Sequence, residues 1–119
     1  MLYTEWIVDN KTYKLRLTTM GVMALEDKLG KNPADIFLAL SDGQLPKIRD
    51  VVNIIHQSLQ SCHNGFTLDK TAALLDTYFE SGHSIYDLVS NEIMKVFQDA
   101  GLLGTSTDDE EAEDEEVKN

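Results

Sequence analysis

The chain is poor in the residues that carry covalent, metal or phosphate chemistry. It has 119 residues and a single cysteine, Cys62, so no disulfide can form within it, which fits a reducing cytoplasm. Ten scattered Lys and Arg stand against 21 Asp and Glu. This balance argues against binding nucleic acid or an anionic membrane through the bulk surface, since phosphates need a basic patch. The glycines are isolated and form no phosphate-binding loop.

Long apolar runs are also missing. None approaches the roughly 20 residues that span a bilayer. Glu5 and Asp9 stand where a secretory signal has its basic and apolar segments, so we do not expect secretion by that route. The chain is nevertheless 42% hydrophobic. Residues 1–104 therefore suit one domain with one core.

The last fifteen residues differ from the rest. Residues 105–119 carry eight carboxylates and one lysine, and so account for −7 of the net charge of −11. Like charges at this density repel one another, and the segment has no apolar cluster to bury against the entropy lost on ordering. We predict a disordered acidic C-terminal tail over residues 105–119.

Residues 3–8 and 12–17 have the pattern of two strands. The apolar residues of the second alternate with cations and would share one face: Tyr13, Leu15 and Leu17. Asp9-Asn10-Lys11 between them has the composition of a tight turn, because Asp and Asn tolerate positive φ. We predict an N-terminal β-hairpin. Two strands alone are marginal in water, so its apolar face must pack on helices or its edge must pair with another chain.

After the hairpin the pattern is helical, with a signal at each boundary. The expected helix starts are Thr18 or Thr19, Asn32-Pro33, Pro46, Thr67, and Ser84 with Asp87, a pair that resembles a capping box. The expected ends are Leu29 with Gly30, Leu40 with Gly43, Asn64-Gly65, Gly82 and Gly101. The predicted fold is mainly α: a small bundle of about five helices with an N-terminal hairpin, in one domain.

Apolar residues at spacings of three and four predict which helix faces are buried. In the third helix these are Ile48, Val51, Val52, Ile55 and Leu59; in the fourth, Leu68, Ala72, Leu75, Tyr78 and Phe79. In the fifth they are Ile85, Leu88, Val89, Ile93, Val96 and Phe97. We expect all of these side chains to face the core.

Cys62-His63, with His56 nearby, is the one cluster that suggests a metal or a nucleophile. A zinc site needs four ligands in paired spacings, and here a second cysteine is absent and His83 is distant in sequence. A Cys–His pair also fails, because neighbouring helical residues point about 100° apart. Glu26-Asp27 and Asp76/Glu80 fit solvated helix faces. We expect no catalytic residue, no metal and no cofactor.

Trp6, Met20 and Met23 allow two interpretations. Methionine and tryptophan are useful at adaptable binding surfaces. The other interpretation is that they are core residues joining the hairpin to the first helix. We carry these three residues and Phe37 as candidate partner-binding residues.

The helical pattern resembles a known family across residues 3–103. A short hairpin leads into Leu17–Pro33, where Leu25-Glu26 and Leu29-Gly30 are separated by two charged residues. The following segments are Ile36–Leu40, Ile48–His56 and Asp69–Gly82. This order resembles the tail assembly chaperones of long-tailed bacteriophages and related proteins of tail-like gene clusters.

The resemblance implies a function. Such chaperones are not enzymes; they bind the tape measure protein in the host cytoplasm, help to recruit tail tube subunits, and are absent from the mature virion. Many have a longer form, made by ribosomal frameshifting, that contacts the tail tube protein. Codons for Val117-Lys118-Asn119 that form the string A-AAA-AAC would permit a slip one base backward. We expect no nucleic acid or membrane partner, and a homo-oligomer remains open.

A rival from another class is a small acidic regulatory adaptor, or an inhibitor that mimics nucleic acid. Its acidic tail would occupy a basic groove of a partner protein. The two hypotheses differ in where binding takes place, in the helical domain or in residues 105–119.

Overall fold

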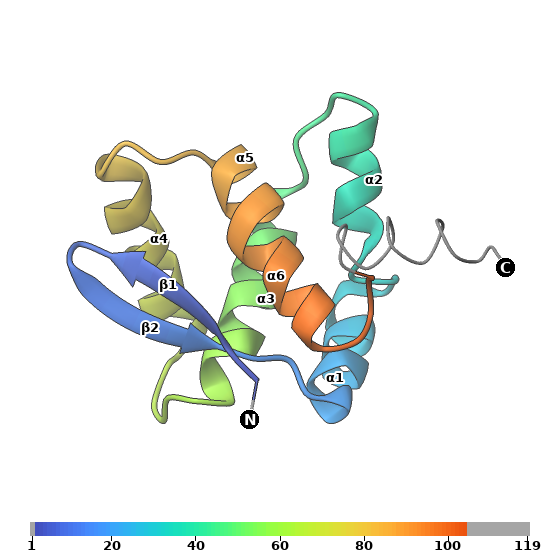
Figure 1. The fold of residues 1–119 in the computed structure, drawn as a ribbon, viewed down its shortest axis with the longest axis horizontal. Helices are drawn as coiled ribbons and strands as arrows, with labels where there is room; N and C mark the ends of the chain where they lie inside the picture. Colours follow the sequence, from blue (N-terminus) through green and yellow to red (C-terminus); the bar gives the residue numbers. More distant parts are fainter. Residues whose placement is uncertain (1, 105–119) are drawn as a thin grey trace, which may run out of the picture.

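The computed structural model describes residues 2–104 (Figure 1). Its elements are β1 (Thr4–Val8), β2 (Lys11–Leu15), α1 (Thr19–Leu29), α2 (Asp35–Ser41), α3 (Ile48–Gln60), α4 (Leu68–Glu80), α5 (Ile85–Asp87), the π-helical η1 (Leu88–Ile93) and α6 (Met94–Asp99). The last three form one C-terminal helix. The predicted fold class, a helical domain of five helices with an N-terminal hairpin, is confirmed. The predicted tail lies outside the described residues.

The hairpin turns on two residues. Asp9 and Asn10 both have positive φ, 52° and 66°, which is the conformation of a type I′ turn. The strands are antiparallel, and Val8 pairs with Lys11 next to the turn. The composition had suggested that Lys11 lies in the turn, but Lys11 is the first residue of β2. A two-residue turn matches the natural twist of the strands, which explains why the hairpin closes so tightly.

Most of the predicted helix boundaries are confirmed. Thr18 and Thr67 cap α1 and α4 by accepting from the backbone N–H of Gly21 and Lys70. Ser84 and Asp87 make both bonds of a capping box, at 3.1 and 3.0 Å.

Two helices begin later than predicted. The Asn32 side chain accepts from the N–H of Ala34, so Pro33 lies in a turn and α2 starts at Asp35. Lys47 is extended, with ψ 136°, and this places Pro46 in the loop before α3. Each of these two helices therefore begins two residues after the proline that predicted its start.

The core lies between the inner face of the hairpin and the helices. The C-terminal helix crosses the middle of the molecule, with α4 and the hairpin on one side and α2 and α1 on the other (Figure 1). The largest fully buried side chains are Trp6, Phe97, Leu15, Leu25, Ile54, Ile55, Leu59, Leu75, Leu88 and Ile93. No helix of residues 2–104 is long and apolar enough to cross a membrane.

Not every side chain expected to face the core is fully buried. Ile48 is 52% exposed, Ala72 is exposed, and Leu68 is half-buried. Val52, Phe79 and Ile85 are half-buried as well, but they pack against the core as predicted. The buried face of α3 instead includes Ile54, and that of α4 includes Thr71, whose hydroxyl donates to the carbonyl oxygen of Thr67. Periodicity identified amphipathic helices correctly, but the buried arc of each is rotated from the predicted stripe.

Candidate functional site

Ile48, Leu68 and Ala72, together with the half-buried Val52, line one surface feature, a shallow groove between α3 and α4. We call it the α3–α4 groove. Its volume is about 230 Å³, and its walls are Ile48, Arg49, Val52, Asn53, Leu68, Asp69 and Ala72. Ile48 and Val52 are four residues apart on α3, as are Leu68 and Ala72 on α4, so each pair lies on one helix face. The groove therefore presents apolar side chains from two helices to the surroundings.

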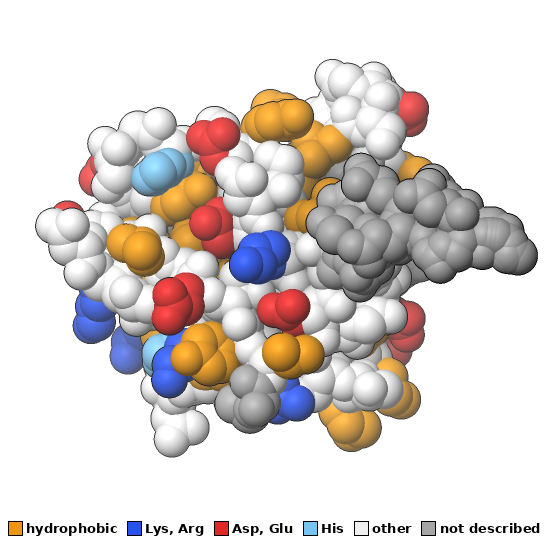
Figure 2. Space-filling view, in the orientation of Figure 1, with side chains coloured by type: hydrophobic (Ala, Val, Ile, Leu, Met, Phe, Trp, Pro, Cys, Tyr) orange, Lys and Arg blue, Asp and Glu red, His pale blue; other side chains and the backbone are white. Residues whose placement is uncertain are grey.

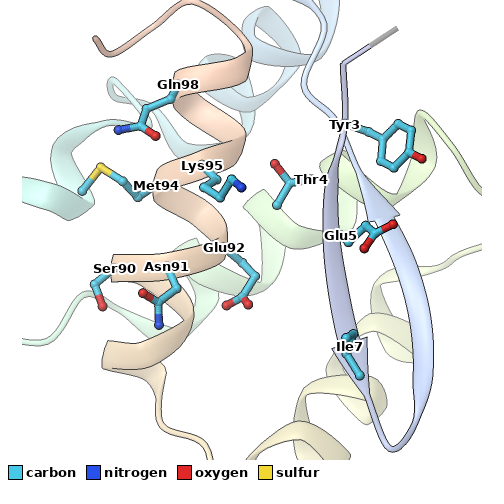
Figure 3. A pocket seen from close by; sticks show the side chains of 10 residues that line it. All are labelled: Tyr3, Thr4, Glu5, Ile7, Ser90, Asn91, Glu92, Met94, Lys95 and Gln98. Atoms are coloured by element: carbon cyan, nitrogen blue, oxygen red, sulfur yellow. The ribbon is translucent and has the colours of Figure 1, made fainter. Parts of the chain in front are cut away.

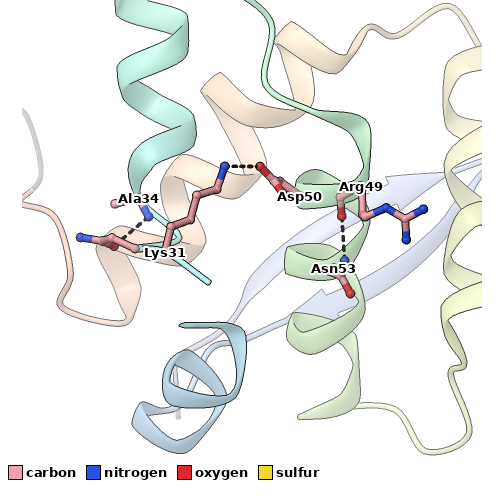
Figure 4. Close-up of polar contacts among 6 residues, drawn as sticks. Lys31, Ala34, Arg49, Asp50 and Asn53 are labelled. Atoms are coloured by element: carbon pink, nitrogen blue, oxygen red, sulfur yellow. Dashed lines mark hydrogen bonds and ion pairs between the residues drawn. The ribbon is translucent and has the colours of Figure 1, made fainter. Parts of the chain in front are cut away.

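The side chain of Asn53, in the wall of this groove, has one polar atom without a hydrogen-bond partner. It is 5% exposed, and its Nδ2 donates to the carbonyl oxygen of Arg49 at 2.9 Å (Figure 4). Because that oxygen can only accept, the orientation of the amide is determined. The Oδ1 atom is then buried with no partner within residues 2–104. A buried unpaired acceptor costs about 1–3 kcal/mol of stability.

The start of α3 is held in place by an ion pair. Lys31, in the loop after α1, lies 2.7 Å from Asp50 in the first turn of α3 (Figure 4). Asp50 is buried, and a carboxylate in the first turn also interacts favourably with the helix dipole. This contact fixes the end of α3 that carries Ile48.

A second and larger groove runs between β1 and the C-terminal helix. We call it the β1 groove. Its volume is about 750 Å³, and its lining residues are Tyr3, Thr4, Glu5, Ile7, Ser90, Asn91, Glu92, Met94, Lys95 and Gln98 (Figure 3). An adjoining hollow of about 530 Å³ shares four of these residues and adds Tyr78, His83 and Asp87. The hydroxyl of Thr4 donates to Asp99 at 3.0 Å and closes one end of the groove.

Carboxylates dominate the electrostatics of the β1 groove. Burial raises the pKa of Glu92, and the charge of Asp87 raises it further. One oxygen of Glu92 is buried with no hydrogen-bond partner in the described chain. Burial also raises the pKa of Tyr78, with smaller contributions from Glu92 and Asp87. Figure 2 shows acidic side chains gathered over β1 and the C-terminal helix, with cationic side chains close by.

The four candidate partner-binding residues do not share one surface. Trp6 is fully buried and packs on Tyr78, with ring centroids 5.4 Å apart, so its assignment as a partner-binding residue is wrong. Met20 and Met23 are 74% and 53% exposed on α1, so for them the core interpretation is wrong. Phe37 is half-buried against Phe97 at 5.1 Å. Sequence reasoning did not identify either groove as a site.

The histidines near Cys62 have structural roles. His63 accepts from the backbone N–H of Lys14 at 2.9 Å, and His56 donates to the carbonyl oxygen of Phe66 at 3.0 Å. Cys62 is half-buried. Within residues 2–104, no three metal-binding side chains gather in one place. Glu26, Asp27, Asp76 and Glu80 are exposed, as expected for solvated helix faces.

The fold and its two grooves define a class: a small helical domain with an N-terminal hairpin and open surface grooves. The chain belongs to DUF6096, a family of unknown function, whose model matches residues 6–118. No curated protein and no solved structure matches the chain.

Proposed function

We propose that this protein is a tail assembly chaperone of a long-tailed bacteriophage, which binds the tape measure protein and helps to recruit tail tube subunits. The observation that supports this most is the α3–α4 groove. Its apolar residues have the spacing of core positions, yet Ile48 and Ala72 are exposed and Val52 and Leu68 are only half-buried. Amphipathic client helices bind such grooves through apolar residues at matching spacings.

The polar rim of the groove suits the same kind of client. Arg49 and Asp69 place opposite charges among the lining residues. An incoming helix with mixed charges beside an apolar stripe would pair with both groups. A long helical protein such as a tape measure protein would carry many segments of that kind.

The proposal includes the setting of the chaperone. It acts in the cytoplasm of the infected host and is absent from the mature virion. A longer frameshifted form supplies the contact with the tail tube protein, with the acidic residues 105–119 as a solubilising spacer. In the gene, a long reading frame for a helical protein directly downstream, overlapping an extension one base back, would support this proposal. Codons at Val117–Asn119 that cannot slip would remove the frameshifting part.

The test is co-expression with the tape measure protein from the same gene cluster. Leu68→Asp and Ile48→Asp place a charge in the groove and should weaken the complex about tenfold or more, which corresponds to about 1.4 kcal/mol. Leu38→Asp, at a 63% exposed position of α2, is the matched control and should retain the client. Complex formation is measured by size-exclusion chromatography and isothermal titration calorimetry. Groove variants that bind as well as the control would contradict the proposal.

The acidic tail supports a second candidate, a regulatory adaptor or nucleic-acid-mimicking inhibitor. Eight carboxylates in residues 105–119 resemble a run of phosphates in charge. Deleting residues 105–119 should abolish binding by such an inhibitor but leave a chaperone able to hold its client. A pull-down with the deletion variant and the full chain separates the two functions.

A further inference from the structure

The hairpin has two outer edges, and the pairing register shows which backbone groups each edge presents. In a hairpin with a two-residue turn, the residues flanking the turn exchange both hydrogen bonds, and every second pair does the same. Val8 and Lys11 flank this turn, so Trp6 pairs with Tyr13 in the same bonded manner. The N–H and C=O groups of Glu5 and Ile7 on β1 therefore point away from β2. On β2, those of Thr12 and Lys14 point away from β1, and the N–H of Thr12, next to the turn, has no hydrogen-bond partner within residues 2–104.

The two edges differ in how these outward groups are satisfied. On β2, the N–H of Lys14 donates to His63, and the N–H of Arg16, just past the strand, donates to the carbonyl oxygen of Ser58 at 3.0 Å. On β1, the N–H groups of Glu5 and Ile7 have no hydrogen-bond partner within residues 2–104. The edge of β1 is thus a row of unused donors and acceptors that faces the β1 groove.

The groove is shaped and charged for one kind of ligand. The C-terminal helix forms its far wall, opposite β1 (Figure 3). Three carboxylates line it and the adjoining hollow, those of Glu5, Asp87 and Glu92, against the single ammonium of Lys95. One oxygen of Glu92 is buried and unpaired.

We propose that the β1 groove binds an extended peptide segment rich in Lys or Arg, which adds to the edge of β1 as a third strand. Backbone hydrogen bonds to Glu5 and Ile7 supply the affinity, as in other cases of strand addition. A cationic side chain of the peptide reaches the carboxylates of Glu92 and Glu5 and supplies the charge preference. This site is separate from the α3–α4 groove, so it does not depend on the function proposed for that groove.

Two other occupants fit less well. One is the chain's own acidic segment, residues 105–119, which follows Gly104, a residue that accepts a hydrogen bond from the groove residue Gln98. Their charge of −7 is repelled by the carboxylates of the groove. The other is a second copy of the chain, which would place a whole hairpin in the groove. Neighbouring strands lie about 4.8 Å apart, so two added strands need twice the width of one. The C-terminal helix bounds the groove opposite β1, so a single strand fits better than a hairpin.

Amide hydrogen exchange on the full chain tests the proposal with a defined probe. The probe is a blocked peptide of alternating Thr and Lys, about seven residues long, close to the usual length of a strand. Millimolar Lys peptide should slow exchange of the Glu5 and Ile7 amides at least about tenfold, which corresponds to about 1.4 kcal/mol. The matching Thr–Glu peptide should not. In a strand, the backbone N–H groups of every second residue point toward one neighbouring strand. N-methylation of the peptide amides that point toward β1 should therefore abolish the slower exchange, whereas N-methylation of the other amides should preserve it.

Variants of the chain complete the test. The double variant Glu5→Gln/Glu92→Gln should weaken binding of the Lys peptide about tenfold. The control is the double variant Glu26→Gln/Glu80→Gln, which removes the same amount of charge away from the groove and should bind the peptide normally. A cooperative urea transition shows that the variants fold. The proposal is wrong if neither peptide protects Glu5 and Ile7, if both N-methylated peptides bind equally, or if protection arises without peptide as a concentration-dependent dimer forms.

Discussion

The two edges of the hairpin differ in whether the rest of the fold supplies hydrogen-bond partners to their backbone groups. The connection between α3 and α4 places His63 on the edge of β2, and α3 itself supplies the carbonyl oxygen of Ser58. The edge of β1 faces a groove and remains unpaired within the described residues. A hairpin of two strands is marginal by itself. One buried face and one closed edge are enough to hold it, and this leaves the other edge available for binding.

The face shared by both strands should dominate stability. Trp6→Ala removes a fully buried side chain that contacts Tyr13 and Tyr78, and should lower the free energy of unfolding by about 3–5 kcal/mol. Ile7→Ala, one residue along β1 but on the exposed side, should change it by no more than about 0.5 kcal/mol. Urea denaturation measures both. Similar losses for the two variants would mean that the hairpin does not pack as described.

Opening the closed edge should cost less. His63→Ala leaves the N–H of Lys14 without its acceptor and should lower the free energy of unfolding by about 0.5–1.5 kcal/mol. Exchange of the Lys14 amide should become faster, while the amides of Glu5 and Ile7 should already exchange quickly in the wild type. His63→Gln, whose side-chain oxygen can accept, should restore part of the protection. If Lys14 exchanges as fast as Glu5 in the wild type, the contrast between the edges fails.

The smallest effect concerns the groove beside the open edge and is the dependence of stability on pH. Glu92 has a raised pKa in the folded protein, so the folded state binds more protons than the unfolded state as pH rises above 4.5, the ordinary pKa of a glutamate. Stability should therefore fall over that window, because the carboxylate must ionise against burial. Glu92→Gln should lose this decline and gain stability relative to the wild type as pH rises.

The measurement is the thermal midpoint of each protein between about pH 4 and pH 8. Asn91→Ala is the control, since Asn91 lines the same groove and carries no ionisable group. Its curve should stay parallel to that of the wild type. Parallel curves for Glu92→Gln would show that the carboxylate is not destabilised by burial.

Local chemistry made much of the fold predictable. Thr18, Thr67 and the Ser84–Asp87 pair cap helices where the sequence placed them, because a cap is made by residues within one turn of each other. The hairpin was predictable for the same reason, since its turn depends on Asp9 and Asn10 alone. The two proline-marked starts were displaced by two residues, because a proline permits a helix to begin but does not require it.

The candidate sites were much less predictable. Trp6 was carried as a binding residue, but an aromatic residue in an alternating strand has no local mark that tells core from surface. Ile48 and Ala72 were placed in the core because spacing identifies an apolar face and not what covers it. Residues Glu5 and Glu92 are far apart in the chain, and no local pattern relates them to one groove.

The sequence by itself determined the elements of this protein: a hairpin, five helices and an acidic C-terminal segment, because each depends on contacts between near neighbours or on charge composition. Only the tertiary structure decided which faces are covered. Packing rotates α3 and α4 so that an apolar groove stays open, and it places His63 on one hairpin edge and a groove on the other. Those outcomes depend on how whole helices fill space against one another, and side-chain spacing within a single helix does not contain that information.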